Sequence, residues 1–85
     1  MEIVYSSKFV KHYKKLSSDL KNIVEEKEEL FKKDPFDRKL KTHKLHGRFS
    51  KYYAFSISNS DRIMFEFWNN KVIFVNIGNH EIHNY

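Results

Sequence analysis

The chain has 85 residues and no cysteine, and its sixteen Lys and Arg against eleven Asp and Glu give a net charge of +5. At this length we expect one domain, residues 1–85, whose thin core buries only about 60 to 65% of the surface that the unfolded chain exposes. The absence of cysteine excludes a disulfide framework, a thiolate metal site and a thiol nucleophile.

The first half of the chain begins with a short strand and a helix. Residues 2–5 form an apolar run that predicts the strand, and Ser6 or Ser7 can accept a hydrogen bond from the free amides of the helix as its N-cap. The apolar residues of this helix recur at i, i+4 and i+7 on one face, and they are Phe9, Tyr13 and Leu16.

A second helix is predicted after Ser17 and Ser18, either of which can cap it. Its apolar stripe comprises Leu20, Ile23, Val24, Leu30 and Phe31. The glutamates between them are expected to face water, and they are Glu25, Glu26, Glu28 and Glu29. The helix is expected to end at Asp34-Pro35, because proline lacks the amide hydrogen and disfavours the α conformation in the residue before it.

From Tyr52 onward the sequence alternates as strands do. Tyr53, Phe55 and Ile57 point to one face, while Tyr52, Ala54 and Ser56 point to the other. Residues 58–61 have turn chemistry, residues 63–67 continue as a second strand, Asn69-Asn70 suits a hairpin turn, and residues 72–77 form a third strand. Trp68 is expected to pack in or beside the sheet. The order βααβββ predicts an α+β fold with two N-terminal helices packed on one face of an antiparallel β-sheet.

The positive charge is concentrated between Arg38 and Lys51. This basic segment has six Lys and Arg, two histidines and no acid, whereas the rest of the chain has ten cations and eleven acids. Its cations are Arg38, Lys39, Lys41, Lys44, Arg48 and Lys51. Such a stripe is expected of a phosphate-backbone binder or of a surface for an acidic protein partner. A charged loop that only keeps the protein in solution is the alternative.

Three motifs, together with the element order, resemble the RelE/ParE superfamily of toxins from bacterial type II toxin-antitoxin modules, and within it the RelE- and YafQ-like ribonucleases. Residues 42–47 (THKLHG) are similar to the family's H-x-L-x-G stretch. Residues 61–65 (DRIMF) are similar to its x-R-I-(I/V)-(F/Y) strand, and residues 77–80 (IGNH) to the I-G-x-H that closes the last strand. The likeness covers nearly the whole chain and implies a RelE-like fold.

The resemblance implies ribosome-dependent cleavage of messenger RNA through attack of the ribose 2′-oxygen on the adjacent phosphorus. This chemistry needs a base, cations near the phosphate oxygens and an acid for the departing 5′-oxygen, and no metal or other cofactor. By motif, the catalytic residues would be His43 and His80, which exchange protons, and Arg62, whose planar fork can hold two phosphate oxygens. For Arg62 the alternative is an ion pair with Asp61 or Glu66.

Other residues are expected to bind RNA rather than to react with it. Four cations would neutralise phosphates of messenger or ribosomal RNA, and they are Lys41, Lys44, Arg48 and Lys51. Tyr85 would stack on a base. The resemblance also implies a cognate acidic antitoxin, which would form a toxin-antitoxin hetero-oligomer with this chain.

Two departures from the family pattern keep other functions open. The stretch before Gly47 lacks the glutamate that YoeB-like members offer as base, and residues 52–58 lack the second histidine of YafQ-like members. A ParE-like inhibitor of DNA gyrase, which binds without cutting RNA, is therefore an alternative, as is a basic RNA-binding module without toxicity. Residues 1–9 lack the apolar segment of a signal peptide, and no run of about 18 apolar residues occurs, so a cytoplasmic location is expected.

Overall fold

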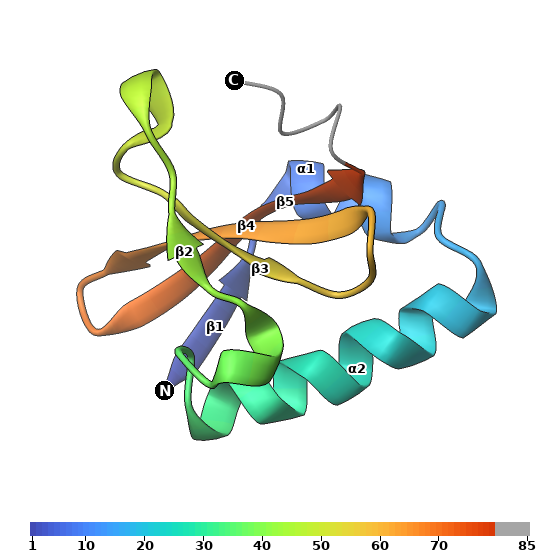
Figure 1. The fold of residues 1–85 in the computed structure, drawn as a ribbon. Helices are drawn as coiled ribbons and strands as arrows, with labels where there is room; N and C mark the ends of the chain where they lie inside the picture. Colours follow the sequence, from blue (N-terminus) through green and yellow to red (C-terminus); the bar gives the residue numbers. More distant parts are fainter. Residues whose placement is uncertain (80–85) are drawn as a thin grey trace.

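Seven helices and strands make up the fold in the computed structural model, which describes residues 1–79. Their order is β1 (Glu2–Tyr5), α1 (Ser7–Tyr13), α2 (Ser18–Lys33), β2 (His43–Lys44), β3 (Tyr53–Ser56), β4 (Asp61–Trp68) and β5 (Lys71–Asn79), with two 3-10 turns, η1 (Arg38–Leu40) and η2 (Gly47–Phe49) (Figure 1). The strands form one sheet in the order β1-β5-β4-β3-β2. The α+β prediction is confirmed.

The sheet differs from the prediction in two respects. A fifth strand, β2, lies within the basic segment at the edge of the sheet and pairs with β3, but its two residues are too short to leave a periodic signal in the sequence. In addition, β1 pairs with β5 in parallel, whereas the other neighbours are antiparallel. The long connection that parallel neighbours require contains α1, α2 and the strands β2, β3 and β4.

Helix α1 is fixed against β5 by polar contacts at both of its ends. Ser6, and not Ser7, is the N-cap: its Oγ accepts from the amide of Phe9 at 3.0 Å and donates to the carbonyl of Val75 at 2.6 Å. Near the other end, Nδ1 of His12 lies 2.6 Å from Oδ1 of the buried Asn76. The capping serine is therefore also a tertiary contact.

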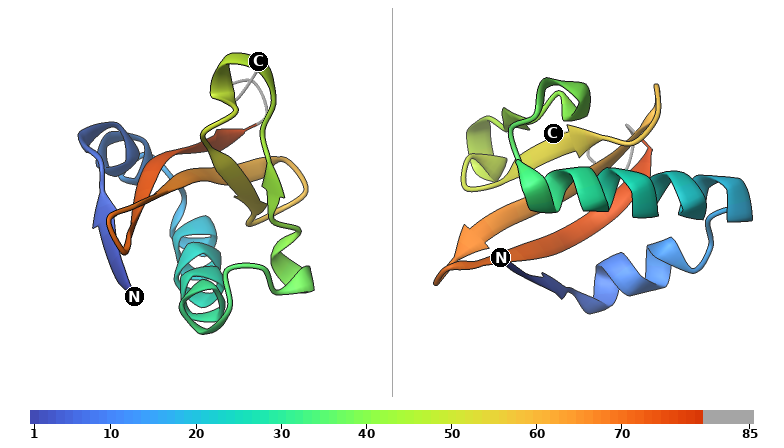
Figure 2. Two further views of the ribbon diagram at one scale, coloured as in Figure 1. Left: turned by 90° about the vertical axis from the view of Figure 1, so that its left-hand side faces the viewer. Right: turned by 90° about the horizontal axis from the view of Figure 1, so that it is seen from below.

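The main core lies between the two helices and one face of the sheet (Figure 2). Helix α2 begins after its N-cap Ser17 and ends at Lys33, immediately before Asp34-Pro35, as expected. At the centre of this core, Phe31 is fully buried, and its ring centroid lies 4.9 to 5.3 Å from those of Phe55, Phe65 and Phe74. The predicted apolar faces of both helices and of β3 and β4 meet here.

A second, smaller cluster covers part of the opposite face of the sheet. It consists of Leu45, Ala54 and Met64, with Phe49, Tyr52 and Val75 packed against it. Residues 45–52 leave the sheet between β2 and β3, on the side away from α2 (Figures 1 and 2). The basic segment is thus an edge of the sheet, anchored by its own apolar contacts.

Two of the predictions concern the β4–β5 hairpin. Asn69 and Asn70 have φ values of 48° and 65°, which confirms the predicted two-residue turn, because a type I′ turn requires positive φ at both positions. Trp68 was expected to pack in or beside the sheet, and this is wrong: the side chain is 59% exposed. It lies at the last position of β4, beyond the reach of either core cluster.

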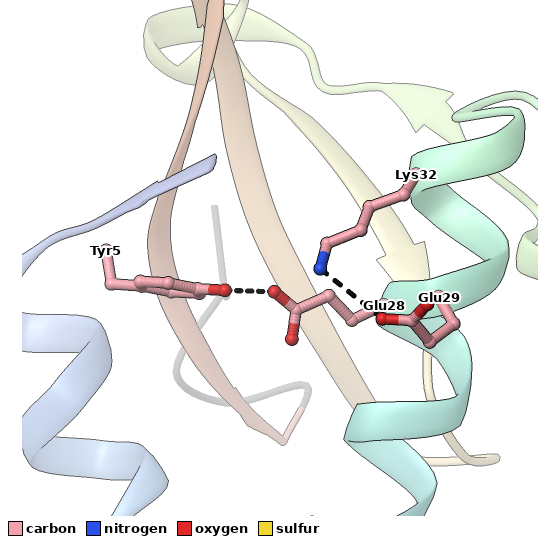
Figure 3. A network of polar contacts seen from close by, with 4 residues as sticks. All are labelled: Tyr5, Glu28, Glu29 and Lys32. Carbon is pink, nitrogen blue, oxygen red and sulfur yellow. Dashed lines mark hydrogen bonds and ion pairs between the residues drawn. The ribbon is translucent and has the colours of Figure 1, made fainter. Parts of the chain in front are cut away.

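Of the four glutamates expected to face water, Glu28 is half-buried and also contacts another element. Its carboxylate accepts a hydrogen bond from the Tyr5 hydroxyl, which joins β1 to α2, while the neighbouring Glu29 pairs with Lys32 at 3.3 Å (Figure 3). Partial burial raises the pKa of Tyr5 above its ordinary value, and the hydrogen bond to Glu28 raises it further. The raised pKa of Tyr13 has burial as its main cause and the nearby Glu25 and Glu28 as further causes.

Candidate active site

Strand β3 brings two of the sequence motifs to the same face of the sheet. His43 of β2 pairs with Ala54, and Arg62 of β4 pairs with Ser56. Because Ala54 and Ser56 are two residues apart, His43 and Arg62 leave the sheet on the same side, the one opposite the helices. Standard strand spacings separate their Cα atoms by about 7 Å along the strands and about 10 Å across them.

A cavity of about 230 Å³ at this edge of the sheet has Arg62 among its lining residues. Its lining residues come from α2, η1 and the end of β3, and they are Lys27, Lys39, Lys41, Ser56, Ile57, Ser58, Asn59 and Arg62. Nη1 of Arg62 is buried and has no hydrogen-bond partner within residues 1–79. Among residues 1–79, four cations and no acid therefore line the cavity.

Neither acid proposed as a partner of Arg62 forms an ion pair with it in the described part of the chain. The Asp61 carboxylate instead accepts from Ser58 Oγ at 2.8 Å and from Ser60 Oγ at 3.4 Å, which closes the β3–β4 turn. The ion pairs found among residues 1–79 join Lys32 to Glu29 and Lys71 to Glu2. Neither carboxylate of that alternative therefore neutralises the Arg62 guanidinium within residues 1–79.

His43 is exposed, and its ring orientation is set by one hydrogen bond. Nδ1 lies 3.1 Å from the carbonyl oxygen of Lys41. Because a carbonyl can only accept, Nδ1 carries the proton, and in the neutral ring Nε2 keeps its lone pair. This tautomer directs a basic nitrogen away from the backbone. His43 does not line the cavity around Arg62, although the adjoining Lys41 does.

Three of the predicted RNA-binding cations lie over aromatic rings. Nζ of Lys44 is 5.9 Å from the ring centre of Tyr53, and Nζ of Lys51 is 5.1 Å from that of Tyr52. The guanidinium of Arg48 is 5.3 Å from the ring of Phe49. These contacts restrain exposed charges on a rigid edge and interleave cations with aromatic faces.

Gly47, the glycine of the first motif, has a φ of 64°, a conformation that residues with a side chain rarely adopt. It opens η2 and turns the chain so that Leu45 and Phe49 both reach the second cluster. The motif glycine is therefore explained by backbone conformation.

Sequence reasoning missed Lys27 and Lys39 as site residues. Lys27 lies on the polar side of α2, and only the path of η1 after Asp34-Pro35 brings Lys39 near it. The concentration of positive charge in residues 38–51 indicated that Lys39 could bind an anion, but no feature of the sequence singled out Lys27. His80 and Tyr85, the remaining predicted site residues, lie outside the described residues.

Comparison with known proteins agrees with this architecture. The structure superimposes on YafQ in the DinJ-YafQ toxin-antitoxin complex of E. coli with a TM-score of 0.81 and 18% identity, covering 99% of this chain and 97% of that one. For the RelB-RelE antitoxin-toxin complex of Methanococcus jannaschii the TM-score is 0.76, with 21% identity and 96% of each chain covered. The YoeB/ParE toxin from Agrobacterium tumefaciens gives a TM-score of 0.79 at 15% identity, covering 94% and 99%. No curated protein matches the chain in sequence.

These structural likenesses define the class as the RelE-like toxin fold. The model of the YafQ family, described as the bacterial toxin of a type II toxin-antitoxin system, matches residues 1–83. The chain therefore belongs to the YafQ toxin family, which confirms the resemblance stated from the three motifs. Neither described helix is long and apolar enough to cross a bilayer.

Proposed function

We propose that this toxin is a cytoplasmic endoribonuclease that cuts messenger RNA on the ribosome without a metal. The observation that carries the proposal is the cavity that Arg62 lines together with three lysines, with Nη1 of Arg62 buried and without a partner among residues 1–79. A buried cationic donor without a partner is costly to a fold. A phosphate oxygen would supply the missing acceptor, and the family match favours RNA cleavage over the gyrase-inhibitor alternative.

In this mechanism Arg62 holds non-bridging oxygens of the scissile phosphate and stabilises their growing charge. His43, through Nε2, takes the proton of the ribose 2′-hydroxyl as its oxygen attacks phosphorus. The bond from phosphorus to the 5′-oxygen breaks, His80 gives that oxygen a proton, and a 2′,3′-cyclic phosphate remains. These roles balance the protons with two histidines and one arginine.

The same assignment gives the surrounding cations a role in RNA binding and predicts the partners of the toxin. Lys41, Lys44, Arg48 and Lys51 would neutralise phosphates of messenger and ribosomal RNA, and Tyr85 would stack on a base. The cognate antitoxin would be acidic and would cover the basic segment. Antitoxin complexes of the structurally similar YafQ and RelE support a partner of this class.

The catalytic assignment is tested by single-turnover cleavage on programmed ribosomes. We expect Arg62→Ala and His80→Ala to abolish cleavage and growth arrest, and His43→Ala to slow cleavage without removing it. His46→Ala is the matched control, since it removes an exposed imidazole from the same segment. Full cleavage by Arg62→Ala or His80→Ala at equal soluble level would refute the assignment. Inhibition of gyrase supercoiling with intact RNA would instead establish the ParE-like alternative.

The role of the basic segment is tested by replacing Lys41, Lys44, Arg48 and Lys51 with Gln. Exposed charges speed the encounter of oppositely charged partners, and salt screens them over about 8 Å at physiological ionic strength. We therefore expect slower antitoxin association, a weaker dependence of that rate on salt, and weaker ribosome binding. If all three stay unchanged, the segment is a solvated surface and no more.

A further inference from the structure

We propose that Lys27 of α2 and Lys39 of η1, with Lys41 and Arg62, form a subsite for one phosphate group of the RNA backbone. The inference deepens the proposed function, on which it rests for the identity of the RNA. It adds two lysines to the site and gives α2, otherwise a core helix, a part in substrate binding. The chemical class of the ligand is a phosphate mono- or diester.

Local structure brings the three lysines to one place. Thr42 Oγ1 donates to the carbonyl of Pro35 at 2.5 Å, and the Asp37 carboxylate accepts from the amide of Lys39 at 2.8 Å. These two bonds fold η1 back against the end of α2, with Leu40 fully buried beneath it. Lys41 has a φ of 54°, a left-handed conformation that costs a lysine about 1 kcal/mol or more. The backbone is thus held in an unfavourable shape where the cations converge.

The charges around the cavity point to an anion. Among residues 1–79 no acid lines it, and two acids close in sequence to Lys39 and Arg62 are engaged elsewhere: Asp37 with the amide of Lys39, and Asp61 with Ser58 and Ser60. Like charges placed together repel each other, so the empty arrangement is strained and an anion relieves it. Arg62 adds a buried donor with nothing to bind in the described chain.

The size and lining of the cavity suit a small oxyanion such as a phosphate group. Pockets for drug-sized ligands begin at about 300 Å³, so a cavity of about 230 Å³ suits a smaller group. Ser56, Ser58 and Asn59 add neutral polar groups at the rim, which suit phosphate oxygens.

The test measures binding separately from cleavage. The full-length His43→Ala protein, labelled with 15N, would be titrated with inorganic phosphate and with a short 2′-O-methyl RNA that cannot be cut. We expect both ligands to shift the amide signals of Lys41, Ser58 and Asn59. Lys27→Gln and Lys39→Gln should each weaken both affinities about tenfold. Each should also lower the slope of log affinity against log salt for the RNA by about 0.7.

Two controls separate a binding role from a structural one. Lys33→Gln removes one exposed charge from the same helix outside the cavity, and it should leave both affinities unchanged. Lys27→Arg keeps the charge and should keep the binding of both ligands. If Lys27→Gln and Lys39→Gln bind phosphate and RNA as tightly as Lys33→Gln does, the subsite is overturned.

The outcomes also distinguish this inference from the proposed function. Phosphate binding that depends on Lys27 and Lys39, without any cleavage of ribosomal messenger RNA by the wild-type protein, would refute the nuclease and leave the subsite established. Normal cleavage by Lys27→Gln and Lys39→Gln at limiting RNA, with no phosphate binding, would overturn the subsite and leave the nuclease standing. Binding of phosphate but not of the RNA would show a site for the free ion only, and would likewise overturn the inference.

Discussion

Replacing Arg62 with Met should stabilise the fold while removing its toxicity. A buried donor left without a partner costs about 1 to 3 kcal/mol, and a charged one lies toward the upper end. Only Nη1 is buried and without a partner among residues 1–79, while the residue as a whole is half-buried, so the cost lies at the lower end of that range. Met keeps the apolar stem and removes the charge, so we expect a gain of about 1 kcal/mol in the free energy of unfolding.

The assay is thermal and urea unfolding of the purified proteins beside growth arrest on induced expression. For a domain of this size, about 1 kcal/mol raises Tm by about 4 to 8 °C, and the urea m-value should not change. Arg48→Met is the control, because it removes an exposed guanidinium and should change stability by less than about 0.5 kcal/mol.

Two results would refute this reasoning. Destabilisation by more than about 1 kcal/mol would mean that Arg62 makes a structural contact, so that its unpaired nitrogen is not a reserved binding group. Stabilisation with full toxicity would mean that the guanidinium is unpaired but has no function. Only higher stability together with loss of toxicity agrees with a donor held ready for a phosphate.

Three further substitutions test the fold around the site. Phe31→Ala should lower the free energy of unfolding by about 3 to 5 kcal/mol, because this ring is fully buried among three others. In a urea titration the variant should therefore be largely unfolded already at low denaturant. Gly47→Ala should lower the free energy of unfolding by about 1 kcal/mol, measured from the urea midpoint. The cost comes from the φ of 64° alone, because no atom lies near the added methyl group. Tyr5 has a raised pKa, so the unfolded chain ionises first as pH rises, and stability is lost above about pH 10. Tyr5→Phe should flatten that alkaline loss in pH-dependent unfolding.

Much of the fold could be predicted because local signals and tertiary packing agree. The strand at residues 2–5, the N-caps, the helix end at Asp34-Pro35 and the Asn69-Asn70 turn each depend on a few neighbouring residues. The alternation of β3 and β4 separates the same residues that the two clusters separate. Local sequence signals were sufficient to predict these elements because the packing of the sheet favours the same conformations.

The rest depended on partners distant in sequence. The parallel pairing of β1 with β5 joins residues about seventy positions apart, and β2 exists only because β3 lies beside it. Glu28 lies on the polar face of α2, yet the hydroxyl of Tyr5 in β1 donates a hydrogen bond to it. The family motifs supplied Arg62, but its lysine neighbours could be found only after η1 had been placed against α2.

Among these differences, β2 and the lysines around Arg62 belong to the candidate site, where local rules are expected to give way to function. Within residues 1–79, a left-handed lysine, a buried Nη1 of Arg62 without a partner and four cations around one cavity each reduce the stability of a small domain. An anion that binds only the folded state repays this cost, by about 2.7 kcal/mol at one hundred times its dissociation constant. Occupancy of the cavity and stability of the toxin are then coupled, so RNA and an acidic antitoxin that reaches the cavity would both protect the folded chain.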